Sequence, residues 1–358
     1  RCLSDWSSDV CSSDLSFFWS VAPDITLRRG IALIGTTMIG VLLAQRFTDE
    51  ELMEITAWAL GACAVLSLAL AVLVPNLGIM TEGSHAGAWR GVFTHKNELG
   101  QRMAFGAIVF LIAHQQRRKW SDLLGLGLCV LMVLMSTSKA ALLALVVSAT
   151  SLVIWRFARM EFKLLVPYGV ALLVLASFAI VWLFNNYMVV LNALGRDATL
   201  TGRTILWSVV VEAVKSRPVL GYGYAGFWTG WEGAAAWVWD LVGWPAPHAH
   251  NGALDLLLSV GIVGTAIYTV GLFINVKRAI AWVRRTGAAV ALWPIFLLTF
   301  VVVMNMAETV VLRRNNYLWI LYVDSTIRLA AWHWARWRSG ERSVGDANES
   351  STRCLVAR

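Results

Sequence analysis

The sequence predicts an all-α polytopic membrane protein with about nine transmembrane helices in this chain and one large outward loop. Of its 358 residues, 58% are hydrophobic and only 15% are charged, whereas soluble domains are about half apolar and about a quarter charged. The apolar residues gather in runs long enough to cross a bilayer, which takes roughly 17–25 residues in a helix. Most of the basic residues fall in short loops between these runs, as expected of a membrane protein.

The apolar runs divide the chain into five parts. Residues 1–15 differ in composition from everything that follows, and we expect them to be a non-native segment. Residues 16–184 should hold about six spans, followed by an outward loop with an amphipathic helix over 185–250, three more spans over 251–331 and a basic cytoplasmic tail over 332–358. The expected spans are 29–46, 52–74, 100–114, 121–136, 139–157, 164–184, 251–275, 288–306 and 316–331.

Basic clusters set the orientation. Three clusters lie within residues 117–119, 156–163 and 277–285, and a fourth is the tail after Arg328. Nine alternating spans place all four clusters on one side, which the positive-inside rule makes the cytoplasm. The same rule explains the net charge of +8 without nucleic acid, and we expect no nucleic-acid partner.

Several basic residues contradict this rule, because the predicted topology turns them outward. Exposed positive charge is tolerated there, but a convergent group also suits a polyanionic ligand. The outward basic residues are Arg90, Lys96, Lys139, Arg203, Arg313 and Arg314.

A polar group precedes the apolar run that starts near residue 251. His250 could be a general base, since imidazole titrates near neutral pH, or a structural residue at a helix start. Asp255, one turn later, could orient an imidazole or bond to Asn251. His248 and His250 stand two apart and cannot share a helical face, and no cysteine or HExxH motif joins them, so we expect no metal.

Residues 200–228 form a second candidate. Thr201 can cap a helix whose first turn holds Arg203, where a guanidinium and free N–H groups suit phosphate oxygens. The helix has a broad apolar face and could lie on the membrane surface. Trp228 and Trp231 then follow, either as a rim for stacking sugars or as an interfacial aromatic belt.

Three shorter motifs complete the candidates. His95, Lys96 and Asn97 could bind substrate or simply cap a helix. Lys139 occupies the turn STSK, where it could snorkel or bind an anion. In the third motif, over residues 305–316, Glu308 could pair with Arg313 or Arg314 to close a turn.

Together these motifs resemble the O-antigen ligase and polysaccharide polymerase superfamily of bacterial inner-membrane glycosyltransferases, and look most like its exopolysaccharide polymerases. The resemblance covers most of residues 16–330. Its most specific part is His250-Asn251, nine residues, then a GxxG that begins at Gly261. The segments GRTILW, HKN, STSK and RPVLGYGYAGF also look like the family's, in the same order.

The resemblance implies a GT-C-type fold whose site faces the periplasm and uses neither metal nor cofactor. It implies that His250 is the general base on the acceptor hydroxyl, while Lys139 and Arg203 hold the pyrophosphate of the donor. Ligases usually carry Arg where this chain has Lys139, and a lysine lacks the bidentate fork. We also expect substrate contacts from Arg90, His95, Lys96, Asn97, His248, Asn251, Glu308 and Arg313.

The predicted function is an inverting glycosyltransferase that polymerises glycan units carried on polyprenyl pyrophosphate. Its partners would be the lipid-linked oligosaccharide, an acceptor glycan and the lipid bilayer, with flippase and chain-length regulator proteins in the same membrane. An O-antigen ligase proper is the alternative within the family. A lipid or glycan transporter and a non-catalytic scaffold are the alternatives from other classes.

Overall fold

The computed structural model describes residues 16–81, 85–157, 203–286 and 289–356, and within these ranges the chain is helical, without strands. The membrane helices begin with α2 (Pro23–Arg46) and α3 (Asp49–Leu73). The remaining elements are η1 (Ser16–Trp19), α4 (Pro75–Gly78), α5 (Lys96–Arg117), α6 (Trp120–Met135), α7 (Lys139–Phe157), α10 (Arg203–Ser216), α11 (Ala236–Val242), α12 (Gly252–Arg285), η4 (Ala289–Leu292), α13 (Trp293–Asn305) and α14 (Tyr317–Val356).

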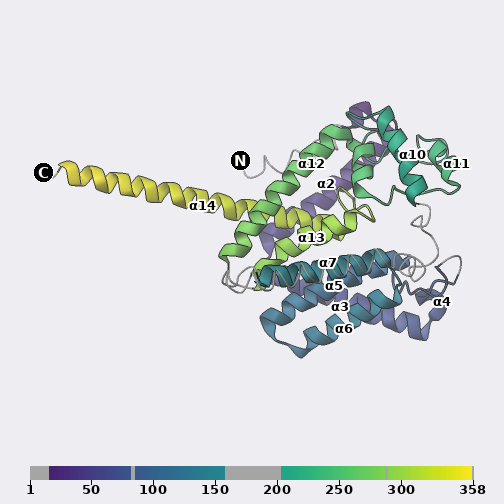
Figure 1. Cartoon of the computed structure of the whole chain (residues 1–358), viewed down its shortest axis with the longest axis horizontal. Coiled ribbons are helices and arrows are strands. Elements are labelled where there is room, and N and C mark those ends of the chain that lie inside the picture. The colour runs from purple at the N-terminus through teal and green to yellow at the C-terminus, as the bar shows by residue number, and fades with distance from the viewer. Residues whose placement is uncertain (1–15, 82–84, 158–202, 287–288, 357–358) are drawn as a thin grey trace, which may run out of the picture.

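Two groups of helices lie side by side (Figure 1). One contains α3, α5, α6 and α7, and the other contains α2, α12, α13 and the first part of α14, with α10 and α11 at one end. The fully buried ring of Phe105 on α5 joins the groups, because it packs against Trp293, Phe296 and Phe300 at centroid distances of 5.8, 5.1 and 5.1 Å. Such aromatic pairs stabilise beyond the area they bury.

The helices fit a multi-pass membrane protein. By length and composition α2, α3 and α12 are long and apolar enough to cross a bilayer, and 120–135, 139–154 and 290–305 form shorter apolar helices. Large apolar side chains point outward, as at Trp58, which is 75% exposed. A lipid environment accounts for such exposure.

The predicted spans agree with the helices only in part. The segment 164–184 lies outside the described residues, as does most of the first half of the 185–250 loop. The helix predicted from residue 100 begins four residues earlier, at Lys96, because His95 caps it. The last helix does not end at residue 331: α14 continues to Val356, since no proline interrupts it.

A kink at Gly261 interrupts α12. Gly261 has φ 64° and ψ −166°, a conformation essentially restricted to glycine. The N–H groups of Ile262 and Val263 donate to the carbonyls of Pro218 and Val219, at 2.8 and 3.2 Å. The GxxG motif thus docks the 217–228 loop onto α12.

The amphipathic helix α10 buries the predicted apolar face. Leu206 and Val210 are fully buried in a second, smaller core that also contains Tyr222, Phe227 and Trp239. Most of this face therefore packs against the protein's own loop, although Ile205 stays 54% exposed.

Candidate functional site

Glu308 lies at the centre of the candidate site, where three other side chains contact its carboxylate. Its Oε2 lies 3.2 Å from Nδ1 of His250, and its Oε1 lies 3.3 Å from Nδ2 of Asn97 and 3.4 Å from Nη2 of Arg203. These partners come from the starts of α5 and α10 and from the residue pair before α12, so the 306–316 segment ties three distant parts of the chain together. The sequence-predicted residues Asn97, Arg203, His250 and Glu308 are therefore neighbours.

Glu308 is held as a carboxylate. Burial alone would raise its pKa, but the hydrogen bond from His250, followed by the electrostatic interactions with His250, His248 and Arg203, outweighs burial and keeps the pKa below its usual value. The expected ion pair with Arg313 or Arg314 is wrong: Glu308 pairs with Arg203, and Arg313 instead donates to the Thr309 carbonyl at 3.1 Å. The physical reason is that packing brings Arg203 of α10 to the Glu308 carboxylate, whereas Arg313 bonds within its own turn.

The carboxylate selects the tautomer of His250. A carboxylate only accepts, so Nδ1 of the neutral ring carries the hydrogen and Nε2 keeps its lone pair. Residue 250 has φ 50°, an uncommon conformation for a non-glycine residue that clusters at functional sites. This backbone turn and the contact with Glu308 together fix the direction of Nε2.

His248 lies beside His250, with ring centroids 4.1 Å apart. Burial, followed by the neighbouring His250, lowers the pKa of His248 to about 3, so its ring is neutral near pH 7. Its Nδ1 accepts the His250 N–H at 3.1 Å. The ring hydrogen therefore sits on Nε2, 3.6 Å from Oε2 of Glu308.

Asp255 holds the loop rather than an imidazole. It accepts from Nε1 of Trp228 at 2.9 Å and from the Ala249 N–H at 3.1 Å, and also from the Thr309 hydroxyl. The expected bond to Asn251 forms only through the backbone, where the Asp255 N–H donates to the Asn251 carbonyl at 3.0 Å. Among the described residues the Asp255 carboxylate bonds to no imidazole. It fixes the backbone immediately before His250.

Asn251 caps α12. Its Oδ1 accepts from the N–H groups of Ala253 and Leu254, at 3.0 and 3.3 Å. Asn251 therefore has a structural role through Oδ1, and its contact with substrate stays a prediction.

Two lysines border the site. Nζ of Lys96 lies 3.3 Å from the Thr137 hydroxyl in the STSK turn, two residues before the exposed Lys139. Burial and the charge of Lys139 lower the pKa of Lys96. The cap interpretation of His95 is confirmed, since its Nδ1 accepts the Asn97 N–H at 3.2 Å.

Arg90 is not part of this group. Its guanidinium donates to the carbonyls of Leu77 and Asn76, at 2.8 and 3.2 Å, and so closes its own loop.

The sequence argument against a metal overlooked the tertiary contacts. His248, His250 and Glu308 each offer a ligand atom, and these atoms lie within 4.8 Å of one another, a set that zinc can use. The left-handed residue 250 brings both rings to one side, and Glu308 completes the group from another helix end. The guanidinium of Arg203 on the same carboxylate opposes a cation there.

Sequence reasoning missed the residues that support these groups. Trp207 donates from Nε1 to the Ala249 carbonyl at 2.8 Å, while the Ala249 N–H donates to Asp255. The place of Trp207 in the GRTILW motif was the signal that could have identified it. Arg29 near the start of α2 had no motif around it.

The chain is similar to a known ligase family and to a protein of exopolysaccharide production. Residues 124–269 match the family model described as O-Antigen ligase, a range that includes Lys139, Arg203 and His250. Over 271 residues the chain is 28% identical to the exopolysaccharide production protein ExoQ of Rhizobium meliloti (strain 1021), which covers 71% of this chain. The chain spans 60% of the length of that relative.

Proposed function

Because the chain belongs to the superfamily of O-antigen ligases and polysaccharide polymerases, we propose that it polymerises glycan units carried on polyprenyl pyrophosphate. The reaction would take place at the outer face of the bacterial inner membrane. The observation that carries the proposal is the His250–Glu308 pair, with Nε2 of His250 left as an acceptor. A base of this kind suits the removal of a proton from a sugar hydroxyl.

The proposed reaction is a single displacement. Nε2 of His250 takes the proton from the acceptor hydroxyl while the hydroxyl oxygen bonds to the anomeric carbon of the donor. The bond from that carbon to the pyrophosphate oxygen breaks, and its electron pair leaves with the pyrophosphate. Attack opposite the leaving group inverts the anomeric configuration. Glu308 orients the imidazole and stabilises its protonated form, as a carboxylate does in catalytic triads.

The leaving group needs only charge stabilisation. Lys96 and Lys139 are the proposed phosphate contacts, because Lys139 is exposed and Lys96 bonds only weakly, to the Thr137 hydroxyl, at 3.3 Å. Arg203 already bonds to Glu308 and to the Ala307 carbonyl, at 3.4 and 3.1 Å. We assign Arg203 a bridging role between the His250–Glu308 pair and the pyrophosphate. Pyrophosphate leaves readily, so the proposed reaction requires no metal.

Polymerase is favoured over ligase for two reasons. Lys139 replaces the arginine usual in ligases, and the matched relative is named for exopolysaccharide production. Flippase and chain-length regulator proteins are the proposed partners in the membrane.

The test is complementation of a polymerase-deficient host with full-length His250→Ala and Arg203→Ala variants, with chain length read on a gel and protein levels by blot. His114→Ala is the matched control, because His114 lies at the end of α5, where its Nδ1 meets the Lys119 carbonyl. We expect loss of long chains in both test variants and normal chains in the control. Normal chains from His250→Ala would refute the base assignment and favour a transporter or a scaffold.

A further inference from the structure

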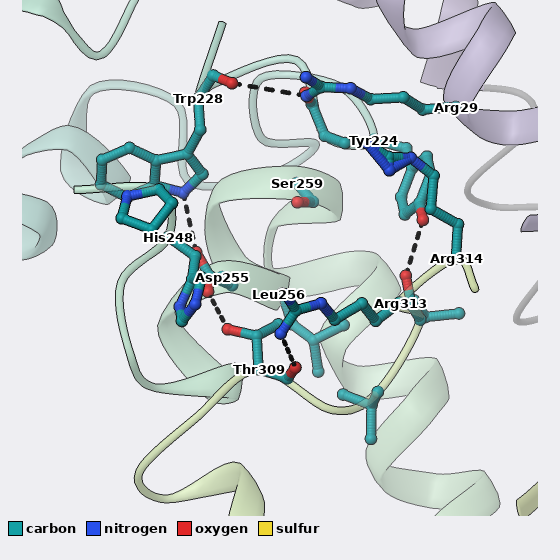
Figure 2. Close-up of a pocket in the computed structure, with 14 residues that line it drawn as sticks. Arg29, Tyr224, Trp228, His248, Asp255, Leu256, Ser259, Thr309, Arg313 and Arg314 are labelled. Atoms are coloured by element: carbon teal, nitrogen blue, oxygen red, sulfur yellow. Dashed lines mark hydrogen bonds between the residues drawn. The ribbon is translucent and has the colours of Figure 1, made fainter. Parts of the chain in front are cut away.

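A cavity of about 240 Å³ adjoins His248 (Figure 2). Its lining comes from α2, the 224–228 loop, the start of α12 and the 306–316 segment. Neither His250, Glu308 nor Arg203 lines it, and neither do the two lysines. The cavity is therefore a compartment beside the proposed base, distinct from the lysine-bordered side.

Three guanidinium groups face this cavity, from Arg29, Arg313 and Arg314 (Figure 2). Across the described ranges none of the three forms an ion pair with a carboxylate. Asp255 also lines the cavity, but its oxygens already accept from Trp228, the Ala249 N–H and Thr309.

Most donors of these guanidinium groups bond to no other described residue, so a ligand can take them. Arg29 uses Nη1 for the carbonyls of Ala225 and Trp228, at 2.6 and 3.4 Å, and Arg313 uses Nη1 for the Thr309 carbonyl at 3.1 Å. A convergent set of arginines at a membrane protein's helix ends is costly unless an anion neutralises it. The planar fork of arginine matches the two oxygens of a carboxylate.

The rest of the lining suits a sugar. Trp228 offers an indole whose position is fixed by its bond to Asp255, 2.9 Å long, and Tyr224 is held by its hydroxyl, which donates to the Leu312 carbonyl at 2.8 Å. Rigid aromatic side chains give apolar contact at little entropic cost.

We propose that the cavity binds a carboxylate-bearing sugar of the acceptor glycan, an inference that rests on the proposed function. A sugar there contacts His248, whose ring centroid is 4.1 Å from that of His250. The next sugar of the same chain then lies beside the base, while the donor pyrophosphate occupies the lysine side. The acceptor is thus selected by its negative charge.

The test is binding to the full-length protein in detergent, measured by titration calorimetry. The probes are a trisaccharide with one glucuronate and its counterpart with glucose at that position. We expect the glucuronate probe to bind about tenfold more tightly, as one charge-assisted hydrogen bond allows. Arg314→Gln, which removes no side-chain hydrogen bond between described residues, and Arg29→Gln should each abolish the preference. Arg28→Gln should retain it, since Arg28 is exposed, does not line the cavity and, among the described residues, bonds to the Asp24 carbonyl alone.

Three results would overturn the inference. They are equal binding of both probes, an equal loss of the glucuronate preference in Arg28→Gln, or binding of inorganic pyrophosphate that depends on Arg314 and is tighter than binding of the glucuronate probe. The last would assign the cavity to the donor. His250→Ala should keep the glucuronate preference. If His250→Ala keeps the glucuronate preference and still makes long chains, the proposed chemistry is disproved but the proposed sugar-binding cavity is not.

Discussion

Replacing Glu308 by glutamine tests the orientation of the base with the least change in shape. The Glu308 side chain is only 13% exposed, so water screens its charge little. His250, Asn97 and Arg203 lie within 3.4 Å of its oxygens. The amide keeps one acceptor and turns an NH2 group toward these donors. Losing one charge-assisted hydrogen bond, worth about 1.5–3 kcal/mol, predicts a kcat lower by roughly 10- to 150-fold.

The assay is the rate of chain extension by purified full-length protein with a lipid-linked donor. We expect the loss in kcat with little change in KM for the donor, because Glu308 acts through His250 rather than on the lipid. Glu308→Asp should recover part of the rate. Glu98→Gln is the matched control, an acid on α5 that bonds to the Thr94 hydroxyl at 3.0 Å. An unchanged kcat in Glu308→Gln, or an equal fall in the control, would refute the proposed role of Glu308 in orienting His250.

Two further predictions concern stability. Burial lowers the pKa of His248 to about 3, so between that value and about 6.5 the unfolded chain binds a proton that the folded chain does not, and stability falls with falling pH by at most about 1.4 kcal/mol per unit. Thermal melts at pH 5–7 should therefore show a shallower slope in His248→Gln, and identical slopes would contradict this. Gly261→Ala should destabilise by about 2 kcal/mol or more, because φ is 64° and the new Cβ meets the Val219 carbonyl. Gly127→Ala, with open space around it, should leave the melting temperature unchanged or raised, and an equal loss there would refute the argument.

The sequence alone determined the class of the protein and named the candidate residues that the structure brings together around Glu308. Long apolar runs predict α2, α3 and α12 because a helix is the way a single segment satisfies its backbone in lipid. The motif of His250 and Asn251 identifies a polar helix start, and the structure places Asn251 at the N-cap of α12. These features depend on short-range order along the chain, which residue type and spacing encode directly.

Only the tertiary structure decided which of those residues act on one another. Glu308 contacts His250 across 58 positions and Asn97 across 211, and spacing gives no information at such separations. For the same reason the sequence left the partner of Asp255 open between an imidazole and Asn251, and offered Arg313 or Arg314 for Glu308. In the folded chain the Asp255 carboxylate bonds to the 228–249 loop and Glu308 pairs with Arg203. Carboxylates pair with the donors that packing brings within reach, and packing is a property of the whole chain.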